Sequence, residues 1–244
     1  MSARAFRAHA LAVAGDAVLR WVSLAAFAMS LSLATSIPAE LMNASDEVRQ
    51  SLTAPFSTIL AAYGAVLAAV YGSFRYTVDR RDGVIAQRLM LQTRRATLAT
   101  RLPATALGGA AVALAATLGG HAALVISMGG VPPDVRAVAA ASALGAVAGL
   151  WGMGLGLVVQ SHLVALFLSA LSIGSSILVA MFWKVGAVYL PLLALLEAFR
   201  FDVSAVGIMS GERLDSSVAT LVSVGWVLTV LVAGSIAFMR RDVK

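Results

Sequence analysis

The sequence predicts an all-α integral membrane protein with six transmembrane helices and both termini in the cytoplasm. First, 60% of the 244 residues are hydrophobic and 12% are charged, and a soluble domain could not bury so much apolar surface. Second, six apolar segments approach or exceed the roughly 20 residues that a helix needs to cross a bilayer. Third, basic residues concentrate in alternate loops, which is typical of cytoplasmic loops. We therefore interpret residues 1–244 as a single transmembrane domain.

The first 19 residues are basic and amphipathic. Arg4 and Arg7, and Arg20 directly after this segment, stand among apolar residues. No small-residue cleavage site follows a short apolar core, so the segment does not resemble a signal peptide. The pattern favours an interfacial helix over about 1–19, with its arginines near lipid phosphates on the inner surface.

Six spans follow along the chain. They are expected at about 20–38, 55–74, 102–128, 137–159, 163–182 and 216–239. Pro55 suits the first turn of the second span. Residues 129–134 leave room only for a tight turn between the third and fourth spans, and residues 160–162 separate the fourth from the fifth.

The Lys and Arg residues orient these spans. With the N-terminus inside, the cytoplasmic side holds 13 basic and four acidic residues, and the outer side holds five basic and eight acidic residues. The inner basic residues are Arg4, Arg7, Arg20, Arg75, Arg80, Arg81, Arg88, Arg94, Arg95, Arg101, Arg240, Arg241 and Lys244; the outer ones are Arg49, Arg136, Lys184, Arg200 and Arg213. Six spans give the even number that this orientation requires.

Residues 183–215 are too long for a turn and too interrupted for a clean span. Pro191, Glu197 and Arg200 stand among apolar residues. We interpret the segment as one or two short re-entrant helices on the outer side. A seventh span is the alternative, but it would place the basic C-terminal tail outside, against the charge distribution.

No catalytic or metal-binding pattern is present in the sequence. The phosphate-binding motif GxxxxGK[ST] is absent, and the two lysines, Lys184 and Lys244, do not lie in glycine-rich loops. There is no cysteine, and the three histidines lack metal-ligand spacing: His9, His121 and His162. No paired charges interrupt the spans, as they would in an ion-coupled carrier. We expect a protein that is not itself an enzyme and takes its energy from elsewhere.

The basic segment 75–101 is the main functional candidate. It carries seven arginines between the second and third spans, where a shorter connection would have sufficed. Residues 84–100 contain no Gly or Pro and favour a helix with Ile85, Leu89, Ala96 and Ala99 on one side. We predict a cytoplasmic docking element for a soluble motor. The alternative is a loop that only fixes topology and lies on anionic lipid.

Small and polar residues mark three spans. Gly145 and Gly149 form a GxxxG step in the fourth span, for which packing within the chain is favoured over a dimer interface. Polar side chains of the second and fifth spans are candidates for lining a substrate path, although helical serines also bond to their own backbone. The candidates are Thr58, Tyr63, Tyr71, Ser169, Ser172 and Ser176.

Taken together, the pattern resembles the permease subunits of ABC-2 type ATP-binding-cassette exporters. The resemblance is carried by the loop residues Asp79, Asp82, Gly83, Leu89, Arg94, Arg95 and Arg101, by the ending 237–243 (AFMRRDV), and by the place of segment 183–215. The chain departs from the family in having Thr93 where proline is common, and arginine where lysine is frequent.

The resemblance implies a transmembrane subunit that exports an amphipathic or hydrophobic substrate, such as a peptide antibiotic, a drug or a lipid. It implies a coupling helix that docks a separate ATP-binding subunit, here through Asp79, Asp82, Gly83, Arg88, Leu89, Arg94 and Arg95. ATP and magnesium would be bound by that subunit, so no cofactor is expected in this chain. A second permease copy or a homologous permease would complete the pathway in a bacterial inner or plasma membrane, with lipid but no nucleic acid as a further partner.

Two other functions remain open from the sequence. A motor-independent channel or secondary carrier would show charged or broken helices at the membrane midplane. A non-transporting membrane partner, such as an immunity or assembly factor, would use the same loop for docking.

Overall fold

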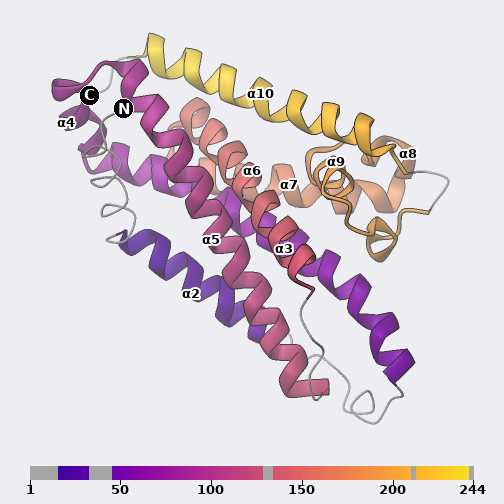
Figure 1. Cartoon of the computed structure of the whole chain (residues 1–244). Helices are drawn as coiled ribbons and strands as arrows, with labels where there is room; N and C mark the ends of the chain where they lie inside the picture. Colours follow the sequence, from indigo (N-terminus) through magenta and orange to yellow (C-terminus); the bar gives the residue numbers. More distant parts are fainter. Residues whose placement is uncertain (1–15, 33–45, 129–133, 210–212, 242–244) are drawn as a thin grey trace.

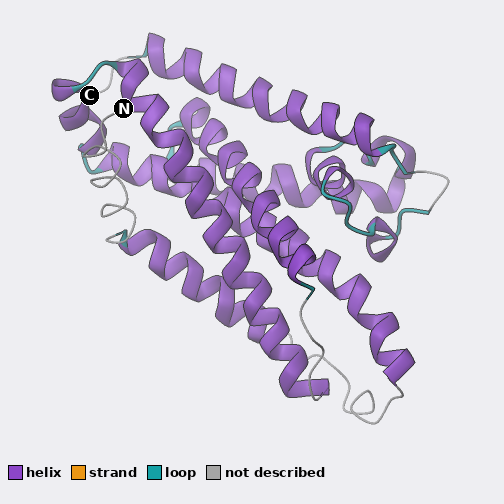
Figure 2. Cartoon of the chain, viewed as in Figure 1, coloured by secondary structure: helices purple, strands orange, loops and turns teal. Residues whose placement is uncertain are grey.

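The computed structural model describes residues 16–32, 46–128, 134–209 and 213–241, without the side chains of 46–54. All regular elements of these residues are helices, which confirms the all-α class (Figure 2). They are α2 (Ala17–Ser32), α3 (Asp46–Arg81), α4 (Val84–Leu91), α5 (Arg94–Met128), α6 (Val135–Val159), α7 (His162–Phe182), α8 (Lys184–Ala187), α9 (Pro191–Ala198), the 3-10 helix η3 (Val203–Val206) and α10 (Ser216–Arg240).

Five of these helices are long and apolar enough to cross a membrane: α3, α5, α6, α7 and α10. They correspond to the second to sixth predicted spans, so the chain is a multi-pass membrane protein. The first predicted span overlaps α2, which has 16 described residues. The rest of that span, residues 33–38, and nearly all of the predicted interfacial helix over 1–19 lie outside the described residues.

Two spanning helices extend well beyond the predicted apolar segments. Helix α3 begins at Asp46 instead of about 55, so Pro55 lies inside it and not in its first turn, and it continues to Arg81 instead of about 74. Helix α5 begins at Arg94 instead of about 102. Hydropathy detects only the apolar part of a helix, whereas arginine is a good helix former and no strong breaker occurs before Asp82 and Gly83. Both helices therefore carry basic ends out of the apolar layer.

Small residues set the packing of α3, α5 and α6. A Cβ atom added to Gly152 of α6 would lie 1.8 Å from the carbonyl oxygen of Ala69 in α3, so the two backbones are in direct contact. The predicted GxxxG step packs within the chain, because a Cβ on Gly145 would lie 2.3 Å from Cβ of Ala113 in α5. Close approach through small residues is the usual way in which helices associate in a membrane.

The remaining helices surround this group. Helix α2 packs along α5, α7 packs on α3 and α6, and α10 crosses the outer side of α6 (Figure 1). The start of α2, the ends of α3 and α10 and the helix α4 gather at one end of the bundle, whereas α8, α9 and η3 lie toward the other.

The interrupted segment 183–215 forms short helices. Helix α9 has eight residues, too few to cross a bilayer, and Pro191 stands at its start, where proline costs no backbone hydrogen bond. Residues 191–197 are buried, and the helix packs against α3, α7 and α10. Helix α9 is thus part of the core.

Candidate docking surface

One end of the bundle is rich in arginine. Its described residues include ten arginines and three aspartates: Arg20, Arg75, Arg80, Arg81, Arg88, Arg94, Arg95, Arg101, Arg240, Arg241, Asp16, Asp79 and Asp82. At the opposite end, the side chains described are balanced: Arg136, Lys184, Arg200, Arg213, Asp134, Glu197, Asp202 and Asp215. We call the first end the arginine-rich end. It carries the candidate coupling segment.

Helix α4 is separated from α3 and α5 by two sharp turns. Gly83 before it adopts the left-handed region (φ 72°), and Gln92 after it is extended. Thr93 then begins α5, because its hydroxyl accepts a hydrogen bond from the backbone N–H of Ala96 at 3.3 Å. The prediction of one helix over 84–100 was therefore wrong: the capping threonine divides it into α4 and the first turns of α5.

The apolar side of α4 attaches it to the bundle. Ile85 is fully buried in a cluster with Tyr76, Met153, Leu157 and Phe238, and Leu89 packs against this cluster. The predicted apolar face is thus confirmed for Ile85 and Leu89. It is wrong for Ala96 and Ala99, which are exposed because the break at Gln92 changes the helical phase.

Two large apolar side chains on α4 remain uncovered. Met90 and Leu91 are each 86% exposed at the C-terminal end of the helix. An open hollow of about 480 Å³ lies beside them, lined by Ala86, Leu89, Met90, Gln92, Thr93 and Arg94. The side of α4 opposite its buried anchor therefore presents an apolar pair next to polar and basic groups.

Behind this surface, Asp79 forms a buried ion-pair network. Its carboxylate accepts hydrogen bonds from Arg75 and Arg101, and Nε of Arg75 also donates to Asp16 at 2.6 Å. Arg101 lies over the ring of Tyr76, 5.7 Å from its centroid. Asp16 in turn caps α2 by accepting from the N–H of Val18. The network ties α2, α3 and α5 together at the arginine-rich end.

Two arginines cap helix ends. Arg94 Nη1 donates to the carbonyl oxygens of Phe238, Met239 and Arg241, at the C-terminal end of α10. Arg241 Nη1 donates to the carbonyl of Val158 near the end of α6, at 2.7 Å. Cations at helix C-termini satisfy carbonyls that lack helical partners and complement the helix dipole. These arginines join three spanning helices at the arginine-rich end.

The predicted coupling residues accordingly divide into two groups. Asp79 and Arg94 are engaged by the bundle itself, as described above, whereas Asp82 and Arg95 are exposed and Gly83, Arg88 and Leu89 are partly exposed. Met90 and Leu91 were not among the predicted coupling residues, although Leu91 is an apolar residue on the polar side of the predicted helix. Asp16 was not predicted either, because its partner Arg75 is 59 residues away and the contact has no local signature.

The predicted path residues are mostly inside the bundle. Thr58 and Tyr71 are buried on α3, and the hydroxyls of Thr58 and Tyr63 have no hydrogen-bond partner among the described residues. Ser169 donates to its own helix, Ser172 accepts from Nε1 of Trp151 at 3.0 Å, and Ser176 accepts from the N–H of Leu192 at 3.4 Å. Ser172 and Ser176 thus connect α7 to α6 and α9, and a path-lining role remains a prediction.

At the opposite end, Arg213 holds α9 and η3 together. It donates to Glu197 and to Asp202, at 3.2 Å each. Burial raises the pKa of Glu197 more than the neighbouring guanidinium lowers it. A hydrogen bond from Ser204 lowers the pKa of Asp202, which is exposed.

No family model, curated protein or solved structure matches this chain.

Proposed function

We propose that the chain is the transmembrane permease subunit of an ATP-driven exporter, with α4 as the helix that receives force from a separate ATP-binding subunit. In this proposal α2 is the first of six spans, the arginine-rich end is cytoplasmic, and α8, α9 and η3 form the outer re-entrant segment. A second copy or a homologous permease completes the pathway in a bacterial plasma membrane.

The observation that carries the proposal is the combination of a rigid anchor and an open surface on α4. Ile85 is buried against α3, α6 and α10, so a displacement of α4 acts on three spanning helices at once. Met90 and Leu91 point out of the same helix and are covered by nothing in the described part of the chain. A short helix of this kind transmits movement only if another protein holds its exposed side.

The charge of the arginine-rich end supports its cytoplasmic placement, because positive residues flanking spans remain on the inner side. The same charge would attract an acidic groove on a soluble subunit. A loop that only fixes topology would explain the arginines. It would explain neither the burial of Ile85 nor the turn at Gly83.

The proposal expects an ATP-binding-cassette subunit to be encoded beside this gene, and the test is reconstitution with that subunit. The proposal expects ATP hydrolysis by that subunit to change when the wild-type chain is added, and Met90→Glu with Leu91→Glu to remove the change. Val135→Glu is the matched control, because Val135 is 77% exposed at the opposite end of the bundle. An unchanged effect of the double variant would reject α4 as the coupling element.

A further inference from the structure

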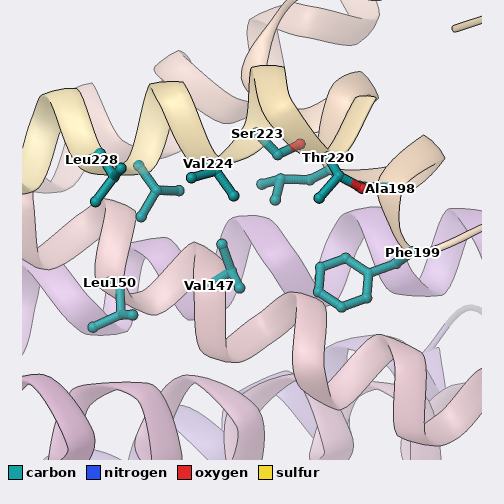
Figure 3. Close-up of a pocket in the computed structure, with 10 residues that line it drawn as sticks. Val147, Leu150, Ala198, Phe199, Thr220, Ser223, Val224 and Leu228 are labelled. Carbon is teal, nitrogen blue, oxygen red and sulfur yellow. The ribbon is translucent and has the colours of Figure 1, made fainter. Parts of the chain in front are cut away.

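A pocket lies in the half of the bundle nearest α9, between α6, α9 and α10. Its volume is about 320 Å³, within the roughly 300–1,000 Å³ typical of small-molecule sites. Figure 3 shows side chains of α10 facing those of α6 across it, with Phe199 at one side. The lining residues are Val147, Leu150, Leu195, Ala198, Phe199, Thr220, Ser223, Val224, Val227 and Leu228.

Ser223 contributes a polar group whose hydrogen-bonding capacity is unused. The residue is 5% exposed, and its hydroxyl has no partner among the described residues. Two other hydroxyls on α10 bond to their own helix: Thr220 donates to the carbonyl of Ser216 and Thr229 to that of Gly225, each at 2.7 Å. A buried hydroxyl without a partner is unfavourable, most of all in a membrane. The hydroxyl is therefore available for an acceptor on a ligand.

The pocket is continuous with an apolar stripe along α10. Half-exposed or exposed residues recur at helical spacing from the pocket toward the arginine-rich end: Leu221, Val224, Leu228, Val232 and Ile236. Val224 and Leu228 belong both to this stripe and to the pocket lining. A chain of methylene groups lying on the stripe would thus lead directly into the pocket.

The depth of Ser223 indicates which acceptor is present. It lies seven residues beyond Ser216, about 10 Å along a helix with a rise of 1.5 Å per residue. The whole of α10 is about 37 Å long, compared with roughly 30 Å of hydrocarbon. With the excess length shared between the two ends, Ser223 lies about 7 Å inside the hydrocarbon boundary, so the ester carbonyl of a phospholipid drawn into the pocket is the acceptor nearest to it.

From these observations we infer that the pocket binds one ester-linked acyl chain of a phospholipid from the leaflet on the α9 side. The acyl chain lies along α10 and enters the pocket between α6 and α9. The ester carbonyl of this acyl chain accepts a hydrogen bond from Ser223. This inference requires only that the bundle spans a membrane and does not depend on the proposed exporter function.

The experiment uses the full-length chain in nanodiscs that contain a phospholipid with a photoreactive acyl chain. After illumination, cross-linked residues are identified by mass spectrometry, and ester-linked and ether-linked versions of the lipid are compared. We expect adducts concentrated on the pocket lining, and pocket labelling by the ester lipid about fivefold stronger than by the ether lipid, the effect of one hydrogen bond.

Three variants make the assignment specific. Ser223→Ala removes the hydroxyl without adding bulk, and should reduce labelling by the ester lipid to that by the ether lipid. Ala198→Phe fills the pocket and should remove its adducts, whereas Val232→Phe adds the same bulk to the stripe beyond the pocket and should retain them. Uniform labelling along the stripe, or equal labelling by the two lipids in the wild-type chain, would overturn the inference.

Discussion

Asp79 and Arg101 form an ion pair in which the side chains are only 7% and 8% exposed, at the junction of the membrane-spanning bundle and α4. The pair joins α3 to α5 across the two turns that flank α4. Because Arg75 extends the pair to Asp16, the start of α2 is held by the same network. These ion pairs therefore hold together the end of α3 and the start of α5, which flank α4, and the start of α2.

Replacing Asp79 should destabilise the protein strongly. Asp79→Asn leaves Arg101 buried without a counter-charge, and breaking a buried pair in this way costs about 3–5 kcal/mol. Asp82→Asn is the matched control, because Asp82 is exposed three residues away and should change stability by about 0.5 kcal/mol or less. Thermal unfolding of both variants in detergent checks the difference. Equal midpoints would show that the pair is not important for stability.

The glycines of the spanning helices should differ sharply in their tolerance of alanine. Gly152→Ala forces a Cβ atom to 1.8 Å from the Ala69 carbonyl, so the contact between α6 and α3 must open. Gly174→Ala on α7 meets nothing within 4 Å and should be neutral or stabilising by about 1 kcal/mol or less. Yield and unfolding temperature of the two purified variants measure this contrast. A stable Gly152→Ala protein would contradict the observed packing.

Glu197 should make the α9 end more stable in mild acid. Its pKa in the folded protein is raised by burial above the ordinary value of 4.5, so the folded state binds its proton more tightly than the unfolded state does. Stability should therefore rise as pH falls from 7 toward 4.5. Glu197→Gln should remove this component of the pH dependence, as measured by thermal unfolding at several pH values. An identical pH profile in the variant would rule out Glu197 as its source.

Single cysteines in this cysteine-free chain test the orientation. Gln92 and Ser204 are exposed at opposite ends of the bundle. With the arginine-rich end inside, a membrane-impermeant thiol reagent should label the Ser204→Cys protein in intact cells and the Gln92→Cys protein only after permeabilisation. The reverse pattern would invert the proposed topology.

The sequence was sufficient for the apolar parts of five spanning helices, because long apolar segments leave little ambiguity, but not for the ends of α3 and α5. It also indicated the packing of Gly145 within the chain. It did not predict the break at Gln92 and Thr93, since neither residue is a strong helix breaker and the cap depends on local geometry. Contacts between distant residues, such as Arg94 with the end of α10, require the assembled fold and have no sequence signature.

The central claim, that α4 docks an ATP-binding subunit, is tested most directly at Leu91. Its side chain is 86% exposed at the end of α4, so a photoreactive amino acid placed there should leave the buried anchor at Ile85 intact. Illumination in living cells should cross-link the chain to a protein that carries an ATP-binding-cassette phosphate loop, and the same amino acid at Val135 should not. Cross-links from position 91 to lipid alone would contradict the account and identify the arginine-rich end as a membrane anchor.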